Sequence, residues 1–129
     1  MRCLLDTHTA FWYFAGSPEL SEKAKAVIED SGNEIFVSIV SAWEIAIKRS
    51  LDRENTTLCS VAEFFDEVAA SGFELITLEP HHVRPVETLP FHHRDPFDRQ
   101  LIATAIAEDM TFVSADGNAR KYNVKWLWE

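Results

Sequence analysis

Short apolar runs with strand character alternate along this chain with longer segments that have helical spacing. The expected strands cover residues 2–5, 34–38, 73–78, 111–114 and 124–127. The expected helices cover residues 9–15, 21–30, 41–50, 61–70, 81–89 and 97–108. This alternation favours a parallel sheet, because each crossover lays a helix on one of its faces. We therefore expect an α/β fold in three layers, in which helices flank a central, mostly parallel sheet of four to five strands.

Local signals set the limits of these segments. Ser21 is a favoured helix N-cap, and Glu22 suits the first turn that follows it. Pro85 interrupts the expected helix at 81–89, which should therefore be short or kinked. Residues 52–57 are polar and are expected to form a loop.

Length and composition describe a globular chain. With 129 residues, 47% of them hydrophobic, the chain is long enough for one domain spanning residues 1–129. No apolar run approaches the roughly 18–20 residues of a membrane span. Asp6 and His8 interrupt the first apolar stretch, so we expect no signal peptide. Cys3 and Cys59 are too few for a disulfide framework, and these absences favour a cytoplasmic protein.

The chain is strongly acidic, with a formal net charge of −9 and a pI of about 4.9. Proteins that bind nucleic acid tightly and without sequence preference usually carry a basic patch. The charge therefore argues against tight non-specific binding, and only weakly against transient cleavage of a nucleic acid.

Four acidic residues far apart in the sequence stand in hydrophobic settings. Asp6 and Asp116 follow apolar runs, and Glu44 and Asp98 lie near the starts of helices. The carboxyl ends of parallel strands meet at one edge of a sheet, where Asp6, Asp116 and Glu44 should lie. Asp98 joins them if its helix crosses the sheet in the right-handed sense. Carboxylates beside a core are costly unless something compensates them, and the simplest shared compensator is a divalent metal ion.

Three of these acids also have structural explanations. Asp6 could cap the helix that follows it. Asp116 could be a turn residue, and Glu44 could pair with Lys48 four positions later on a helix surface.

The helix that begins near residue 97 offers a further alternative. Asp95 precedes Pro96, a favoured first helical residue, so we favour Asp95 as the N-cap over a direct role as a metal ligand. Asp98 could complement the dipole of the same helix. The convergence of all four acids on one edge nevertheless favours a site.

Four blocks of the sequence resemble a known family. They are residues 4–8, 38–48, 89–103 and 112–116, of which the third is the most specific. The chain resembles the PIN-domain family, in particular the VapC-type toxins of bacterial toxin–antitoxin pairs. At Ser114 the family more often has threonine. The resemblance implies that Asp6, Glu44, Asp98 and Asp116 form the acidic quartet of the site.

The chemistry implied by this resemblance is metal-dependent hydrolysis of RNA phosphodiester bonds. Mg²⁺, with Mn²⁺ as a substitute, takes oxygen ligands and lowers the pKa of a bound water. We expect Asp6 and Asp98 to be the principal ligands. Asp116 would complete the set or hold a water, and Glu44 would hold a second ion or orient the attacking water.

Several neighbouring residues are candidates for supporting roles. Side chains that could support the acids are Asp95, Thr7 and Ser114, although a structural role is favoured for the two hydroxyls. Basic residues that could contact phosphate are Lys48, Arg94 and Arg99, each with a surface charge as the default. Direct metal ligation by His92 or His93 is not favoured.

The resemblance also implies partners. It implies a homodimer and a cognate antitoxin that blocks the site with a basic side chain. The aromatic residues of the first helix could serve such a dimer, but core packing is the default for Phe11, Trp12 and Phe14.

Two other classes of function compete with a ribonuclease. One is a phosphatase with Asp6 as its nucleophile, but His8 stands where such enzymes usually have a second aspartate. The other is a non-catalytic module that binds a metal or a protein on the same fold.

Overall fold

The central element is a parallel sheet, with strand order β3-β2-β1-β4-β5 in the part of the chain that is described. The computed structural model describes residues 1–51 and 58–129, so the loop expected at 52–57 lies outside the described residues. The strands are β1 (Arg2–Leu5), β2 (Glu34–Ser38), β3 (Glu74–Ile76), β4 (Thr111–Val113) and β5 (Lys125–Leu127). The expected α/β architecture is confirmed, with all the described strand pairs parallel.

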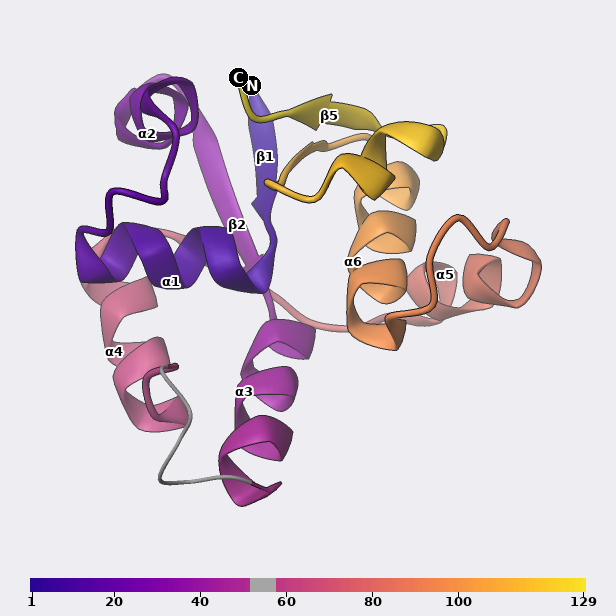
Figure 1. The fold of residues 1–129 in the computed structure, drawn as a ribbon, viewed down its shortest axis with the longest axis horizontal. Coiled ribbons are helices and arrows are strands. Elements are labelled where there is room, and N and C mark those ends of the chain that lie inside the picture. Colours follow the sequence, from indigo (N-terminus) through magenta and orange to yellow (C-terminus); the bar gives the residue numbers. More distant parts are fainter. Residues whose placement is uncertain (52–57) are drawn as a thin grey trace.

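Helices flank this sheet on both faces (Figure 1). The α-helices are α1 (Thr7–Ala15), α2 (Glu22–Glu29), α3 (Ile39–Leu51), α4 (Val61–Ala70), α5 (Pro80–Val83) and α6 (Pro96–Ala107). Two 3₁₀ helices, η1 (Arg84–Thr88) and η2 (Gly117–Lys121), complete the description. The helix expected at 81–89 is short, as predicted from Pro85: α5 ends after one turn and η1 follows it, because Pro85 cannot donate an α-helical hydrogen bond. The sequence did not indicate η2.

The sheet separates two hydrophobic cores. Side chains alternate along a strand, so Cys3 and Leu5 of β1 enter one core and Leu4 enters the other. The first core packs against α1, α2 and α4, with Phe64 of α4 fully buried in it. The second core packs against α6 and η2, which contribute Leu101, Ile102, Ala105 and Ala119. The three expected layers are therefore present.

The strand order places a switch point beside the central strand. From β1 the chain moves outward through β2 and β3, then returns to the other side of β1 with β4 and β5. Ligand sites in such sheets form outside the carboxyl ends of the strands at the point where the direction reverses. The first turn of α6 lies at this edge, beside the start of α3 (Figure 1).

The aromatic residues of α1 pack within the protein. Phe14 lies 5.9 Å from Phe64 and 5.8 Å from Phe73 between ring centroids, and Trp12 lies 5.9 Å from Trp128. Phe11, Trp12 and Phe14 are half-buried against the first core. Core packing is confirmed, and a dimer that uses their exposed parts stays a prediction.

No α-helix among residues 1–51 and 58–129 is long and apolar enough to cross a membrane.

Candidate active site

Asp6 and Asp116 lie together because β1 and β4 are neighbours. Asp6 caps α1, where its carboxylate accepts a hydrogen bond from the backbone N–H of Thr9 at 2.7 Å. Asp116 caps η2 and accepts from the N–H of Asn118 at 2.9 Å. Ser114 joins the two acids: its hydroxyl oxygen accepts from the N–H of Asp116, and its side chain hydrogen-bonds to Asp6. The capping roles are therefore real, and they fix both carboxylates at one edge.

Burial perturbs the Asp6 carboxyl. The residue is only 8% exposed. Burial raises the pKa of Asp6 above its ordinary value, because the charged form loses hydration, while the hydrogen bonds from Ser114 and Thr9 act in the opposite direction. A buried carboxylate that is so constrained is poorly placed to act as a covalent nucleophile.

Glu44 is buried inside this edge and held by two side chains. It is 2% exposed. The Thr7 hydroxyl donates to its Oε1 at 2.7 Å and lies 2.9 Å from Oγ of Ser41. Lys48, which is 40% exposed at its side chain, pairs with Oε2 across the i,i+4 spacing. The predicted pair with Lys48 is present, but Glu44 itself is not a surface residue, and Lys48 is engaged with it.

Asp98 lies close enough to the other three acids of the quartet to be affected by their charges. Burial is the largest influence on its carboxyl, followed by repulsion from the carboxylates of Asp95, Asp6, Glu44 and Asp116, and together they raise its pKa to about 7. The structure therefore brings together the four acids that the sequence singled out.

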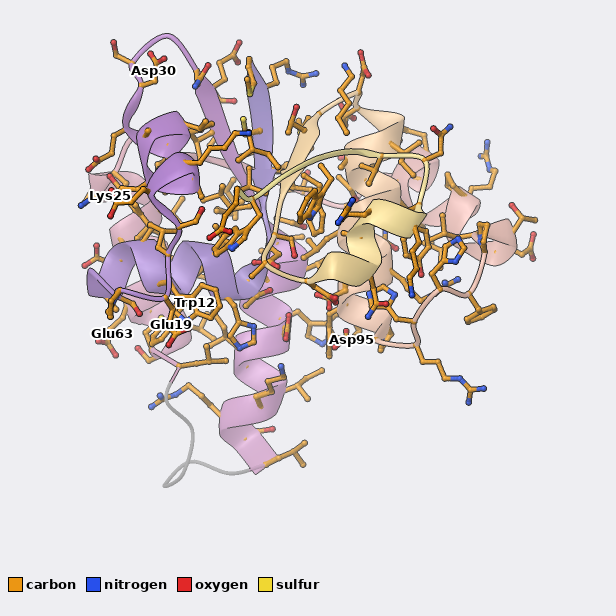
Figure 2. The ribbon with its side chains drawn as sticks, turned by 45° about the horizontal axis from the view of Figure 1, so that its top comes forward. Trp12, Glu19, Lys25, Asp30, Glu63 and Asp95 are labelled. Carbon is orange, nitrogen blue, oxygen red and sulfur yellow. The ribbon has the colours of Figure 1, made fainter. Side chains whose placement is uncertain are left out.

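Asp95 is the N-cap of α6, as the sequence favoured (Figure 2). Its Oδ1 accepts from the backbone N–H groups of Phe97 at 2.9 Å and Asp98 at 3.1 Å. The cap fixes the first turn of α6 and hence the position of Asp98. The negative charge of Asp95 also adds to the repulsion that Asp98 experiences.

His93 is closer to the acids than the sequence suggested. Its Nε2 lies 3.8 Å from Oδ2 of Asp98 and 3.8 Å from Oδ2 of Asp116. Its Nδ1 lies 2.8 Å from the hydroxyl oxygen of Tyr122. His92 instead is exposed and packs edge-on against the Tyr122 ring. The paired histidines before the helix were a visible signal, whereas nothing in the sequence pointed to Tyr122.

Arg99 was predicted as a phosphate contact, and this prediction is wrong. The residue is 4% exposed. Its guanidinium donates to the backbone oxygens of Pro90 at 2.7 Å and Leu89 at 2.9 Å, and to the Tyr122 hydroxyl at 3.2 Å. It also lies 3.9 Å from the ring centre of Phe91. Arg99 therefore anchors the loop before α6 and cannot reach a substrate.

Arg94 is the predicted phosphate contact that stays open to solvent. It is exposed, and it lines a surface hollow of about 700 Å³ with Phe91, His92 and His93. His93 lines this hollow and also lies 3.8 Å from carboxylate oxygens of Asp98 and Asp116, so the hollow is next to the acids.

The donor set fits a hard divalent cation. Ligand atoms of His93, Asp98 and Asp116 lie within 4.8 Å of one another. Burial and then repulsion from the neighbouring carboxylates raise the pKa of Asp98, and of these neighbours Glu44 is paired with Lys48. Carboxylate oxygens are the donors that Mg²⁺ and Mn²⁺ take. Asp6, Glu44, Asp98 and Asp116 therefore suit such an ion.

A second cluster, formed by His81, His82 and Glu108, has a structural explanation. The backbone N–H of Glu79 donates to Nδ1 of His82, so the neutral ring carries its proton on Nε2 and donates it to Glu108 at 2.7 Å. His81 lies 2.8 Å from the same carboxylate oxygen. The hydrogen bonds from His82 and His81 lower the pKa of Glu108 to about 2. The cluster ties α5 to the end of α6.

A sequence profile of the PIN domain matches residues 3–125. The chain belongs to the PIN domain family. This PIN domain is 28% identical over 120 residues to Ribonuclease VapC22 of Mycobacterium tuberculosis, a match that covers 92% of this chain and 90% of the relative.

Solved structures share the fold of this PIN domain. A chain in the crystal structure of VapBC2 from Rickettsia felis, bound to a DNA fragment from the promoter, has a TM-score of 0.70 and 15% identity, with 100% of both chains covered. A chain of DNA-bound VapBC from Salmonella typhimurium has a TM-score of 0.69 and 10% identity, with 98% of this chain and 97% of that chain covered. At these low identities the similarity shows a common fold.

Proposed function

We propose that this PIN domain is a Mg²⁺-dependent endoribonuclease and the toxin of a toxin–antitoxin pair, with residues 1–129 forming one domain. The observation that carries the proposal is the convergence of Asp6, Glu44 and Asp116 on Asp98 at the switch point of the sheet. The similarity to a protein named as a ribonuclease supports RNA as the substrate. Chains of similar fold in VapBC structures and in a toxin–antitoxin complex from Klebsiella pneumoniae support an antitoxin as the partner.

In this proposal Asp6 and Asp98 hold the ion, and Asp116 completes the set. The ion supplies a Lewis acid that polarises the scissile phosphate and lowers the pKa of water. Glu44, fixed by Thr7 and Lys48, orients the attacking water toward the phosphorus atom. The caps formed by Asp6 and Asp116 keep these oxygens in place before substrate binds. Arg94, exposed at the adjacent hollow, attracts the phosphate backbone.

The remaining parts of the proposal concern the metal, the cellular compartment and the protein partners. Mn²⁺ can replace Mg²⁺, since both take oxygen ligands. The protein acts in the cytoplasm as a homodimer, and the exposed parts of the α1 aromatic rings are candidates for that interface. The antitoxin inserts a basic side chain among the acids, for which the net charge of −9 is electrostatically suited.

Cleavage of a panel of structured and single-stranded RNAs tests the proposal. Purified protein without partner is assayed with Mg²⁺, with Mn²⁺ and with EDTA, beside Asp98→Asn and the matched control Asp66→Asn at an exposed position of α4. We expect metal-dependent cutting that Asp98→Asn removes and Asp66→Asn retains. If folded, metal-binding protein cuts no RNA in the panel, two explanations remain: a very narrow RNA target, or a binding module on this fold. Trapping of a phospho-aspartate, an acyl phosphate, at Asp6 would establish the phosphatase alternative.

Thr7→Val is expected to lower the cleavage rate about 10- to 100-fold, the usual effect of removing a residue that orients a metal-site side chain. Valine matches the shape of threonine but has no hydroxyl, so Glu44 loses a donor at 2.7 Å. Thr7→Ser keeps the hydroxyl and serves as the control. Single-turnover rates measure the effect, and an unchanged rate in folded Thr7→Val would show that Glu44 needs no such partner.

A further inference from the structure

The hydroxyl of Tyr122 is a crowded hydrogen-bonding centre next to the acids. The backbone N–H groups of His92 and His93 both point to its oxygen at 3.3 Å. Nη1 of Arg99 donates to the same oxygen at 3.2 Å. Its shortest contact, at 2.8 Å, is with Nδ1 of His93. Tyr122 is 5% exposed, so these protein groups rather than bulk water determine its hydrogen bonding.

Counting donors and acceptors assigns the proton of His93. The two backbone N–H groups and the arginine can only donate, so they share the two lone pairs of the phenol oxygen and leave its proton free to be donated. Among the described contacts, the proton of the Tyr122 hydroxyl then has one acceptor, which is Nδ1 of His93. A neutral imidazole that accepts at Nδ1 carries its proton on Nε2. His93 therefore presents an N–H group, and not a lone pair, toward Asp98 and Asp116.

We propose that Tyr122, held by Arg99, fixes His93 in the Nε2–H tautomer and thereby keeps histidine nitrogen out of the metal site, which lowers the affinity for Zn²⁺ relative to Mg²⁺. The inference rests on the proposed metal-dependent function and adds a determinant of metal identity to it. Distance alone would allow His93 to be a metal ligand, because its Nε2 lies 3.8 Å from the carboxylate oxygens of both Asp98 and Asp116. The hydrogen bonds of Tyr122 favour a His93 that presents Nε2–H over a His93 that binds metal through Nε2.

The selectivity follows from ligand chemistry. A nitrogen that carries a proton cannot coordinate a metal ion. Zn²⁺ binds imidazole well and gains from a nitrogen ligand, whereas Mg²⁺ prefers oxygen ligands alone. For His93 to offer Nε2, its proton would have to move to Nδ1, which faces the Tyr122 oxygen. The hydroxyl proton of Tyr122 would then lose its acceptor, so the wild-type chain resists this change.

Nitrogen-15 NMR of the histidine rings reads the tautomer directly, without metal or RNA. The protein is labelled with ¹⁵N and studied in alkaline buffer, and His93→Gln identifies the signal of His93. We expect the Nε2–H form in the wild type and a shift toward the Nδ1–H form in Tyr122→Phe. Tyr13→Phe is the matched control, because it removes the other tyrosine hydroxyl of the chain at α1. It should leave the tautomer unchanged.

Calorimetric titration with Mg²⁺ and Zn²⁺ measures the consequence for metal choice. In Tyr122→Phe we expect the ratio of Zn²⁺ to Mg²⁺ affinity to rise about tenfold, the effect of a single buried hydrogen bond. The rise should disappear in the double variant Tyr122→Phe with His93→Gln, because no imidazole is left to coordinate. Tyr13→Phe should keep the wild-type ratio. These readings do not depend on cleavage, so absent nuclease activity would contradict the proposed function and not this selectivity.

Two results would overturn the inference. One is an Nδ1–H tautomer of His93 in the wild-type protein, and the other is an unchanged affinity ratio in folded Tyr122→Phe. If Tyr122→Phe does not fold, His93→Gln alone still decides. A retained Zn²⁺ affinity supports the inference, and a specific loss of Zn²⁺ affinity identifies His93 as a ligand.

Discussion

Asp98→Asn is expected to raise the stability of the metal-free protein and to abolish the further stabilisation that Mg²⁺ provides. In the wild type, burial and the carboxylates of Asp95, Asp6, Glu44 and Asp116 all disfavour the charged form of Asp98. Asparagine has nearly the same shape without the charge, so the repulsion disappears. It is a poorer ligand for a hard cation, so the metal loses a principal donor.

The size of the stabilisation by Asp98→Asn depends on pH. The pKa of Asp98 is raised from 3.8 to about 7, so the folded state binds more protons than the unfolded state between these values. Stability of the metal-free wild type should therefore fall as pH rises through this window and stay low above it, by on the order of a few kcal/mol. The advantage of Asp98→Asn should be largest above pH 7 and absent below about pH 4.

Melting temperatures in EDTA and in Mg²⁺, measured across this range for wild type, Asp98→Asn and Asp66→Asn, check the prediction. Asp66→Asn should follow the wild type, since this residue is exposed on α4. A sharp loss of stability in Asp98→Asn, together with a retained Mg²⁺ shift, would show that Asp98 is structural.

Arg99→Met is expected to lower the free energy of unfolding by roughly 3–5 kcal/mol, the range for removing one partner from a buried charged network. Methionine fills similar space but donates no hydrogen bond. The backbone oxygens of Leu89 and Pro90 would lose a charged donor, and the hydroxyl of Tyr122 would lose its contact with Nη1. The ring of Phe91 would lose its cation at 3.9 Å.

Urea unfolding of Arg99→Met beside Arg94→Met measures this difference. Arg94 is exposed in the same loop, so its replacement should change stability by less than about 0.5 kcal/mol while weakening RNA binding. Equal stabilities of the two variants would mean that Arg99 is not the anchor of the loop. Arg99→Lys is not a conservative change here, because a lysine cannot reach several acceptors with one planar fork.

The sequence predicted the parts of the site that depend on strand order. Asp6 and Asp116 were placed at one edge because parallel strands share their carboxyl ends, and Glu44 followed because α3 begins directly after β2. Asp95 was predicted as a cap because a local pattern, an acid before proline, determines that role. All of these features are set by neighbours in the chain or by the sheet itself.

The sequence could not predict contacts that join distant segments through side chains. The hydrogen bonds of Tyr122 with His93 and Arg99 span 29 and 23 positions of the chain. The spacing of apolar and polar residues along the sequence does not indicate such contacts. Arg99 looked like a surface charge because arginine usually is one. Thr7 was considered only as a supporting hydroxyl, and its bond to Glu44 spans 37 positions. Such hydrogen-bond partners can be identified only from the folded structure of the loops.

The acids stand on both sides of the sheet, and this division has a consequence for the lifetime of the folded chain. Asp6 begins α1, which belongs to the first core, whereas Asp98 and Asp116 begin α6 and η2, which belong to the second. A cation shared by these residues is a cross-link between two layers, and both layers must separate from it before the chain can open. We therefore expect metal loading to slow unfolding and to raise resistance to proteases. The metal-bound chain would then outlast the same chain without metal.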